Sequence, residues 1–181
     1  LGGSLTPQVA GEAVARAEKL YAARKYLDAA AAYAVVLSEF PSSLTADAQL
    51  RIGITALNLR KIPEAIAALA KVPASSREVR TEALSYLAQA YARSRRWEEA
   101  RAVLEEMRRA YANSVFTARA FVSVGPIANE AKNARDADYF LRTAVSSFQG
   151  SPEVAQIQFD LAWAAHELKD YSESSRLLTE H

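Results

Sequence analysis

The chain has 181 residues, of which half are apolar and about a quarter charged, and its formal net charge is +1. This composition is typical of a folded domain with a substantial core and excludes a disordered chain. The near-neutral charge gives no reason to expect nucleic acid or an anionic membrane as a partner. The absence of cysteine excludes disulfides and thiolate chemistry. No apolar run reaches the roughly 18–20 residues of a membrane span.

One pattern of three residues recurs five times. An apolar or small residue is followed three positions later by a small residue, and four positions after that by a large apolar one. The triplets are Tyr26/Ala29/Tyr33, Ile62/Ala65/Leu69, Trp97/Ala100/Leu104, Ala134/Ala137/Leu141 and Tyr171/Ser174/Leu178. The small residue returns after 36, 35, 37 and 37 residues. A period in the mid-thirties over nearly the whole chain predicts an all-α fold of about five helix-turn-helix repeats.

We interpret residues 1–7 as a linker or a cut edge and residues 8–181 as a single helical-repeat domain, with repeats over about 8–43, 44–76, 77–114, 115–150 and 151–181. In the first repeat we expect helices over residues 8–23 and 26–39, ended by Pro41. In the second, Thr45 is the expected N-cap of a helix that ends at Leu59. Pro63 then opens a short helix that ends at Lys71.

The third repeat is the most regular, because Leu84, Leu87, Ala88 and Tyr91 share one face and Trp97 begins the second helix. In the fourth repeat, Pro126 lies inside the first helix, so we expect a kink or break over 122–125.

The last helix begins near Tyr171, after Pro152 has opened the fifth repeat. It leaves Leu177 and Leu178 without a covering element. We therefore expect the chain to continue beyond His181, or this end to be covered by another molecule.

An acidic residue directly precedes the small residue in every repeat: Asp28, Glu64, Glu99, Asp136 and Glu173. Each acid falls in the first turn of a predicted helix, where the helix dipole favours a negative charge. On the second helix of the third repeat, the outer face carries Arg101, Glu105, Arg108 and Arg109. We interpret that face as a solvated, ion-paired surface.

The triplets resemble the tetratricopeptide repeat. Its first-helix signature, a large apolar residue followed by a small one, is present as Ile52-Gly53, Leu87-Ala88, Val124-Gly125 and Leu161-Ala162. The first repeat departs from it with Arg16-Ala17, and the fourth begins its second helix with Ala134 in place of an aromatic residue. The resemblance covers about residues 8–181. It implies a right-handed superhelix whose first helices line a concave binding surface.

The turns between repeats are similar to those of bacterial envelope proteins. These aromatic-x-x-Ser turns occur at 40–43, 111–114 and 148–152, and the segments 48–54, 82–92 and 155–166 look like the helical superhelix that precedes the catalytic domain of soluble lytic transglycosylases. Outer-membrane assembly lipoproteins and cell-division coordinators carry similar turns. The resemblance implies a bacterial periplasmic or cell-envelope location and an association with peptidoglycan.

No arrangement of catalytic residues is apparent. The two histidines, His166 and His181, are too far apart on a helix to share a metal, and acid pairs such as Glu98/Glu99 fall on helix exteriors. We therefore expect a non-catalytic chain with no cofactor and no metal. If it belongs to a lytic transglycosylase, the catalytic glutamate lies in a separate domain.

The repeat register predicts the residues of the groove formed by the first helices. The principal candidates are Tyr21, Asn58, Gln89, Arg93, Arg119, Asn129, Trp163 and His166, and the same register adds Glu18, Leu50, Ile54, Gln156 and Phe159. Trp163 could anchor a peptide or stack on a sugar ring, or it could pack against a further domain. Arg93 and Arg119 could hold a carboxylate or be ordinary surface residues.

Two functions fit these features. In the first, the chain is the superhelical domain of a larger envelope enzyme such as a lytic transglycosylase, and positions the catalytic domain against peptidoglycan. In the second, it is a free-standing adaptor that binds a partner peptide in its groove. The expected partner is a protein, a peptide or a further domain of the same chain, with peptidoglycan as a further candidate and with no nucleic acid and no membrane span.

Overall fold

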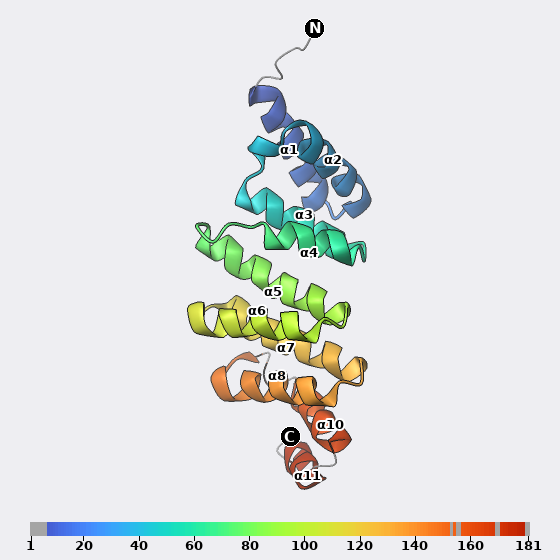
Figure 1. Ribbon diagram of the computed structural model, residues 1–181, viewed down its shortest axis with the longest axis vertical. Coiled ribbons are helices and arrows are strands. Elements are labelled where there is room, and N and C mark those ends of the chain that lie inside the picture. Colours follow the sequence, from blue (N-terminus) through green and yellow to red (C-terminus); the bar gives the residue numbers. More distant parts are fainter. Residues whose placement is uncertain (1–6, 153, 155–156, 169–170, 180–181) are drawn as a thin grey trace. The chain divides into compact units, whose positions relative to one another are not determined.

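The computed structural model describes residues 7–152, 154, 157–168 and 171–179, and this part of the chain is helical with no strand (Figure 1). The α-helices are α1 (Pro7–Ala22), α2 (Tyr26–Glu39), α3 (Ala46–Asn58), α4 (Ile62–Ala70), α5 (Arg77–Arg93), α6 (Trp97–Ala110), α7 (Val115–Glu130), α8 (Ala134–Ser147), α10 (Gln158–Glu167) and α11 (Tyr171–Thr179). A short 3-10 turn, η1 (Pro41–Ser43), follows α2. The all-α class predicted from the period is confirmed.

The chain forms two compact units, one up to Tyr86 and one from Leu87. In the first unit α1 packs on α2 and α3 packs on α4, and in the second unit α7 packs on α8 and α10 packs on α11 (Figure 1). These are the helix pairs that the repeat pattern predicts. The N-cap prediction also holds, because Thr45 Oγ1 accepts a hydrogen bond from the backbone N–H of Ala48 at 3.1 Å.

The turn inside each helix pair has the same geometry in four repeats. One basic residue per turn has a positive φ: Arg24 at 58°, Arg60 at 59°, Arg95 at 58° and Lys132 at 61°. The residue after it donates its N–H back to the carbonyl five positions earlier, as Lys25 does to Leu20 at 3.0 Å. This left-handed cap usually uses glycine. A cation there gains from the dipole at the helix C-terminus, which partly offsets the strain of the non-glycine residue.

The small residues of the triplets let the paired helices approach closely. Ala29, Ala65, Ala100 and Ala137 are all fully buried. The closest approach is at the first-helix glycines. A Cβ built on Gly53 would lie 2.4 Å from Leu69 Cγ, and one on Gly125 would lie 2.3 Å from Leu141 Cδ2. In both pairs the leucine lies sixteen residues after the glycine in the sequence. Its side chain packs directly onto the backbone of that glycine.

Polar contacts join successive second helices in the second unit. Arg101 of α6 forms an ion pair with Asp136 of α8 and lies over the Tyr139 ring, with its guanidinium carbon 4.5 Å from the centroid. The Tyr139 hydroxyl donates a hydrogen bond to Glu105. The outer face of α6 is thus partly an interface between repeats. The predicted ion pairing of this face is confirmed, since Arg101 and Glu105 both form ion pairs, and in addition the two residues contact the next repeat.

The same kind of link occurs one repeat later. Arg142 of α8 donates to Glu173 of α11 at 3.0 Å, and Arg176 donates to the same carboxylate at 2.7 Å. Both Asp136 and Glu173 are the acids that precede the small residue of their repeat. Their position near a helix N-terminus agrees with the dipole argument, and the arginine of the preceding repeat adds a second reason for a negative charge there.

Two further expectations need correction. Helix α7 runs without interruption through Pro126, so of the predicted kink or break the break is wrong, and the kink stays a prediction. Proline removes only one backbone hydrogen bond, and buried side chains hold the helix on both sides, since the Phe121 ring lies 6.5 Å from Phe140 and 5.9 Å from Phe148. At the other end, Leu177 is buried, whereas Leu178 remains 52% exposed.

Replacing Gly125 with alanine should destabilise the protein. The new methyl group would overlap the buried Leu141 side chain, and such overpacking costs about 1–3 kcal/mol, more than the roughly 1 kcal/mol that alanine gains in helix propensity. Urea unfolding followed by circular dichroism measures the change. The matched control is Gly11→Ala in α1, where a Cβ meets nothing within 4 Å. An increase in stability for Gly125→Ala would contradict the close contact.

Replacing Glu173 with glutamine should remove a pH-dependent part of the stability. Hydrogen bonds from Arg176 and then Arg142 lower the pKa of Glu173 from its ordinary 4.5 to about 2. A carboxyl group whose pKa is lowered on folding stabilises the folded state at pH values above its ordinary pKa. This contribution is lost as the pH falls towards the lowered pKa of about 2. The thermal midpoint of the wild type should exceed that of Glu173→Gln at neutral pH, and the gap should close between pH 4.5 and 2.

The control for this experiment is Glu167→Gln. Glu167 is exposed at the end of α10 and forms no ion pair within the described residues. A midpoint difference for Glu173→Gln that stays constant over the whole pH window would show that the two arginine contacts do not act on this carboxylate.

Candidate functional site

The predicted groove residues divide between the two compact units. Tyr21 and Asn58 belong to the first unit, and the second holds Gln89, Arg93, Arg119, Asn129, Trp163 and His166. Each group is therefore described within its own unit. The richest local arrangement lies on α10 and the end of α7.

Three side chains form an exposed strip along α10, which we call the aromatic strip: Phe159, Trp163 and His166. They are spaced by four and three residues, so they share one face of the helix. Phe159 is 63% exposed and Trp163 is 42% exposed. The rings of Trp163 and His166 lie 6.0 Å apart with an interplanar angle of 32°. The strip thus leaves two large apolar side chains, Phe159 and Trp163, exposed beside His166.

The end of α7 and the turn after it hold this strip in place. Asn129 Nδ2 donates a hydrogen bond to the backbone carbonyl of Asp160 at 2.7 Å, which fixes α10 against α7. Lys132, the left-handed turn residue, places its Nζ 5.7 Å from the centroid of the Trp163 ring. This distance is within the range of a cation–π interaction. The fourth repeat therefore positions the main aromatic group of the fifth.

The charges around the strip have both signs. Burial raises the pKa of Asp160, and the nearby carboxylate of Glu130 raises it further. Lys132 contributes a positive charge on the side of Trp163. The oxygen Oδ1 of Asn129 is buried and has no hydrogen-bond partner among the described residues. An apolar centre with a mixed polar rim is typical of protein and peptide interfaces and does not favour a polyanion.

The remaining candidates of the second unit lie on α5 and α7. Arg93 and Arg119 are exposed, and Gln89 is half-buried. Their proposed role in holding a carboxylate stays a prediction. Gln156 lies outside the described residues.

In the first unit, Tyr21 belongs to a cluster of tyrosine and arginine side chains. Its ring meets that of Tyr26 edge-on at 5.8 Å, and the guanidinium of Arg51 lies 5.9 Å from its centroid. Arg51 also forms an ion pair with Glu18 at 2.6 Å. Burial raises the pKa of Tyr33 to about 12, and Glu18 adds to the effect. Because Glu18 already neutralises Arg51, this cluster is a weak anion site.

The other first-unit candidates differ in exposure. Asn58 is exposed at the end of α3. Leu50 and Ile54, which the register also placed on the binding surface, are buried in the core. The repeat register correctly placed Leu50 and Ile54 on the first helix of the second repeat. It was wrong to assign their side chains to the exposed binding surface.

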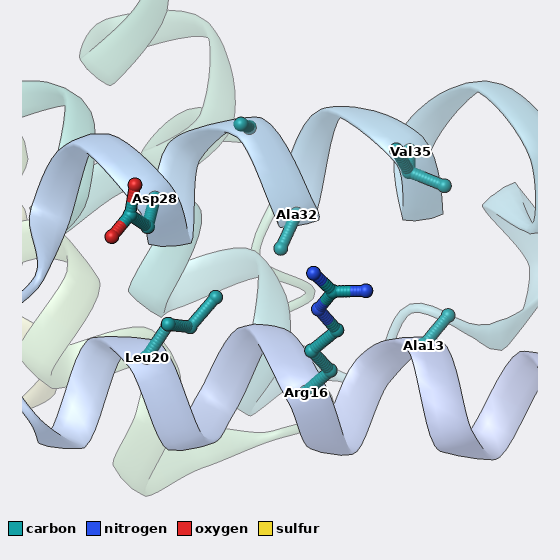
Figure 2. A pocket seen from close by; sticks show the side chains of 7 residues that line it. Ala13, Arg16, Leu20, Asp28, Ala32 and Val35 are labelled. Carbon is teal, nitrogen blue, oxygen red and sulfur yellow. The ribbon is translucent and has the colours of Figure 1, made fainter.

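A groove that the sequence analysis missed lies between α1 and α2 (Figure 2). It has a volume of about 460 Å³, and its walls are Ala13, Arg16, Leu20, Asp28, Ala31, Ala32 and Val35. The sequence feature that could have indicated this groove is Arg16-Ala17, which departs from the first-helix signature. A second groove of about 340 Å³ runs between α8, α10 and α11, where the bonds of Glu173 to Arg142 and Arg176 form part of its wall.

Among the described residues, no group of three or more His, Asp or Glu side chains is placed to bind a metal ion. In the same part of the chain, every helix is too short or too polar to span a bilayer. The expectation that the chain is non-catalytic stays a prediction.

Comparison with known protein families decides the class. The tetratricopeptide repeat model matches twice, over residues 14–79 and 50–115, and these matches together cover more than half of the chain. This chain belongs to the tetratricopeptide repeat family. The resemblance derived from the triplets is thereby confirmed for the family. No curated protein sequence matches the chain.

Solved structures share the fold of this tetratricopeptide repeat protein. MamA residues 41 to the end from Desulfovibrio magneticus RS-1 superposes with a TM-score of 0.69 at 17% identity, over 94% of this chain and 92% of MamA. The apo form of RapI gives 0.74 at 14% identity, over 98% of this chain and 54% of RapI. A putative kinesin light chain with tetratricopeptide-like repeats from Podosopora anserina gives 0.64 at 16% identity, over 96% and 93%. Identities this low establish the fold alone.

Proposed function

We propose that this tetratricopeptide repeat chain is a non-catalytic scaffold that binds a protein or peptide partner through the aromatic strip of α10. The observation that carries the proposal is the exposure of Phe159 and Trp163 on one helix face, beside a lysine that the preceding repeat supplies. Tryptophan is enriched among the residues that dominate binding energy at protein interfaces. Two large exposed apolar side chains one helical turn apart provide such an anchor.

The surroundings of the strip indicate the chemistry of the partner. An apolar or aromatic residue of the partner would cover Trp163 and Phe159. An adjacent carboxylate would meet Lys132, whose ammonium already lies over the indole ring. The bond from Asn129 to the Asp160 carbonyl holds α10 in place, so little ordering is needed when the partner binds. The preferred partner is therefore a segment with an apolar anchor next to an acidic residue.

We also propose a cellular setting, which rests on sequence resemblance. The aromatic-x-x-Ser turns and the segments similar to lytic transglycosylases support a place in the bacterial periplasm or cell envelope. In that setting the chain would be the superhelical domain of an enzyme that acts on peptidoglycan. The exposed side chain of Trp163 is also suited to stacking on a sugar ring. This property favours the peptidoglycan-associated role as a second candidate function.

Trp163 fluorescence separates the two candidates. In a Trp97→Phe background Trp163 is the one remaining tryptophan, because the chain has two. The full chain would be titrated with peptides selected from a random display library, and separately with purified muropeptides. We expect the selected peptides to shift the emission and to carry an apolar residue next to an acid. A shift with muropeptides alone would favour the peptidoglycan-binding role.

Replacing Trp163 with alanine should weaken binding of the selected peptides roughly thirtyfold, because loss of a dominant interface residue costs about 2 kcal/mol or more. Isothermal titration calorimetry on the full chain measures this change. Val115→Ala is the matched control, since Val115 is 52% exposed at the start of α7 and lies outside the strip. Equal affinity of wild type and Trp163→Ala would contradict the proposed binding surface.

A further inference from the structure

The groove between α1 and α2 carries two opposite charges on its walls. Figure 2 shows the Arg16 side chain rising from α1 into the space beside Ala32, while Asp28 projects from α2 opposite Leu20. Both charged residues are exposed, and neither forms an ion pair with another residue in the described part of the chain. The rest of the wall is made of alanine, leucine and valine side chains.

The groove carries a positive charge because the first repeat departs from the first-helix pattern at Arg16. The residues equivalent to Arg16 are large and apolar: Ile52, Leu87, Val124 and Leu161. The last three are buried, and Ile52 packs against the cluster that contains Ala17, Ala29 and Tyr33 of the first repeat. This position therefore faces a neighbouring helix pair when one is present. Arg16 places a positive charge on this face of the first helix pair. An apolar partner that covered the face would bury this charge without an ion-pair partner, which is costly.

Two of the four equivalents of Asp28 pair with an arginine of another repeat, whereas Glu99 pairs with Arg96 of its own repeat. Asp136 and Glu173 occupy the same position in their repeats, and each pairs with an arginine from a neighbouring second helix, Arg101 and Arg142 respectively. Their side chains are only 13% and 18% exposed. A helical surface that brings an arginine to Asp28 would reproduce this arrangement.

We propose that a second copy of this chain binds to the groove through a twofold axis between Arg16 and Asp28. In a twofold interface each residue meets its counterpart reciprocally, so Arg16 of each copy would pair with Asp28 of the other. The groove of each copy thus contributes one arginine and one aspartate, and the two grooves together form two ion pairs. Ala31 and Ala32 of α2 line the groove next to this axis, so their small side chains let the two copies come close together there.

Other properties of the chain agree with self-association. The formal net charge of +1 produces little repulsion between two copies. The small side chains Ala31 and Ala32 leave room for a helix to approach closely. The groove is separate from the aromatic strip, so this inference stands without the proposed partner-binding site.

Charge reversal tests the pairing directly. Sedimentation equilibrium from micromolar to millimolar protein should show a reversible dimer of the wild type. Arg16→Glu and Asp28→Arg should each weaken the dimer by about tenfold or more, because like charges then face each other. An equimolar mixture of the two variants should recover dimers, because both reciprocal pairs are again of opposite charge. The double variant, with both reversals in one chain, should also recover them.

Lys19→Glu is the control. It makes the same charge change on α1 but Lys19 does not line the groove, so its dimer should keep the wild-type affinity. Circular dichroism confirms that all variants are folded. A wild type that is monomeric at all concentrations would overturn the proposal. So would a dimer that ignores both reversals, or single variants that fail to recover dimers when mixed.

Discussion

The close contact between a small residue of a first helix and a large residue sixteen positions later is the constraint on which the rest of the structure depends. At Gly53 and Gly125 the leucine of the partner helix lies against the backbone itself. Where the small residue is alanine, as at Ala17 and Ala88, it is fully buried. Packing of this density fixes the distance between the helices of a pair. It therefore determines which faces of the pair remain for neighbouring repeats and for partners.

Contacts between repeats follow from this geometry and differ along the chain. In the second compact unit, Arg101 and Arg142 reach the acids of the next repeat. Lys132 extends over Trp163 of the repeat that follows it. In the first repeat, Arg16 replaces the apolar residue that would normally pack, and Asp28 has no arginine from a neighbouring helix among the described residues. The repeats thus share one packing scheme but present different surfaces, which allows one face to take a partner peptide and another a second copy.

Much of the fold could be predicted from the sequence, because the features that determine it recur. The start of α2 at Tyr26, the start of α6 at Trp97 and the cap at Thr45 all follow from local patterns. The uninterrupted α7 could not be predicted, because the local effect of Pro126 was outweighed by packing around Phe121. The left-handed turns at Arg24, Arg60, Arg95 and Lys132 were missed because the usual signal for that conformation is glycine.

The candidate site was less predictable than the fold. The repeat register placed Trp163 and His166 on one exposed face, and the structure brings them together. The role of Lys132 could not be inferred, because it depends on where a turn in one repeat meets a helix of the next. Leu50 and Ile54 were assigned to the surface because a register gives a helix face only to within part of a turn, and both residues are buried. Periodicity therefore identifies helices and their cores better than it identifies the edges of a groove.

A double-mutant cycle at Gly53 and Leu69 tests the central packing claim most directly. Leu69→Ala alone should cost about 2–5 kcal/mol, because it empties a fully buried site, and Gly53→Ala alone should cost about 1–3 kcal/mol through overlap with Leu69. If the two groups touch, the double variant should be more stable than the sum of these losses predicts, because the new methyl group enters the space that the leucine vacates. Strict additivity of the two free-energy changes would show that the glycine and the leucine do not interlock, and would contradict the account.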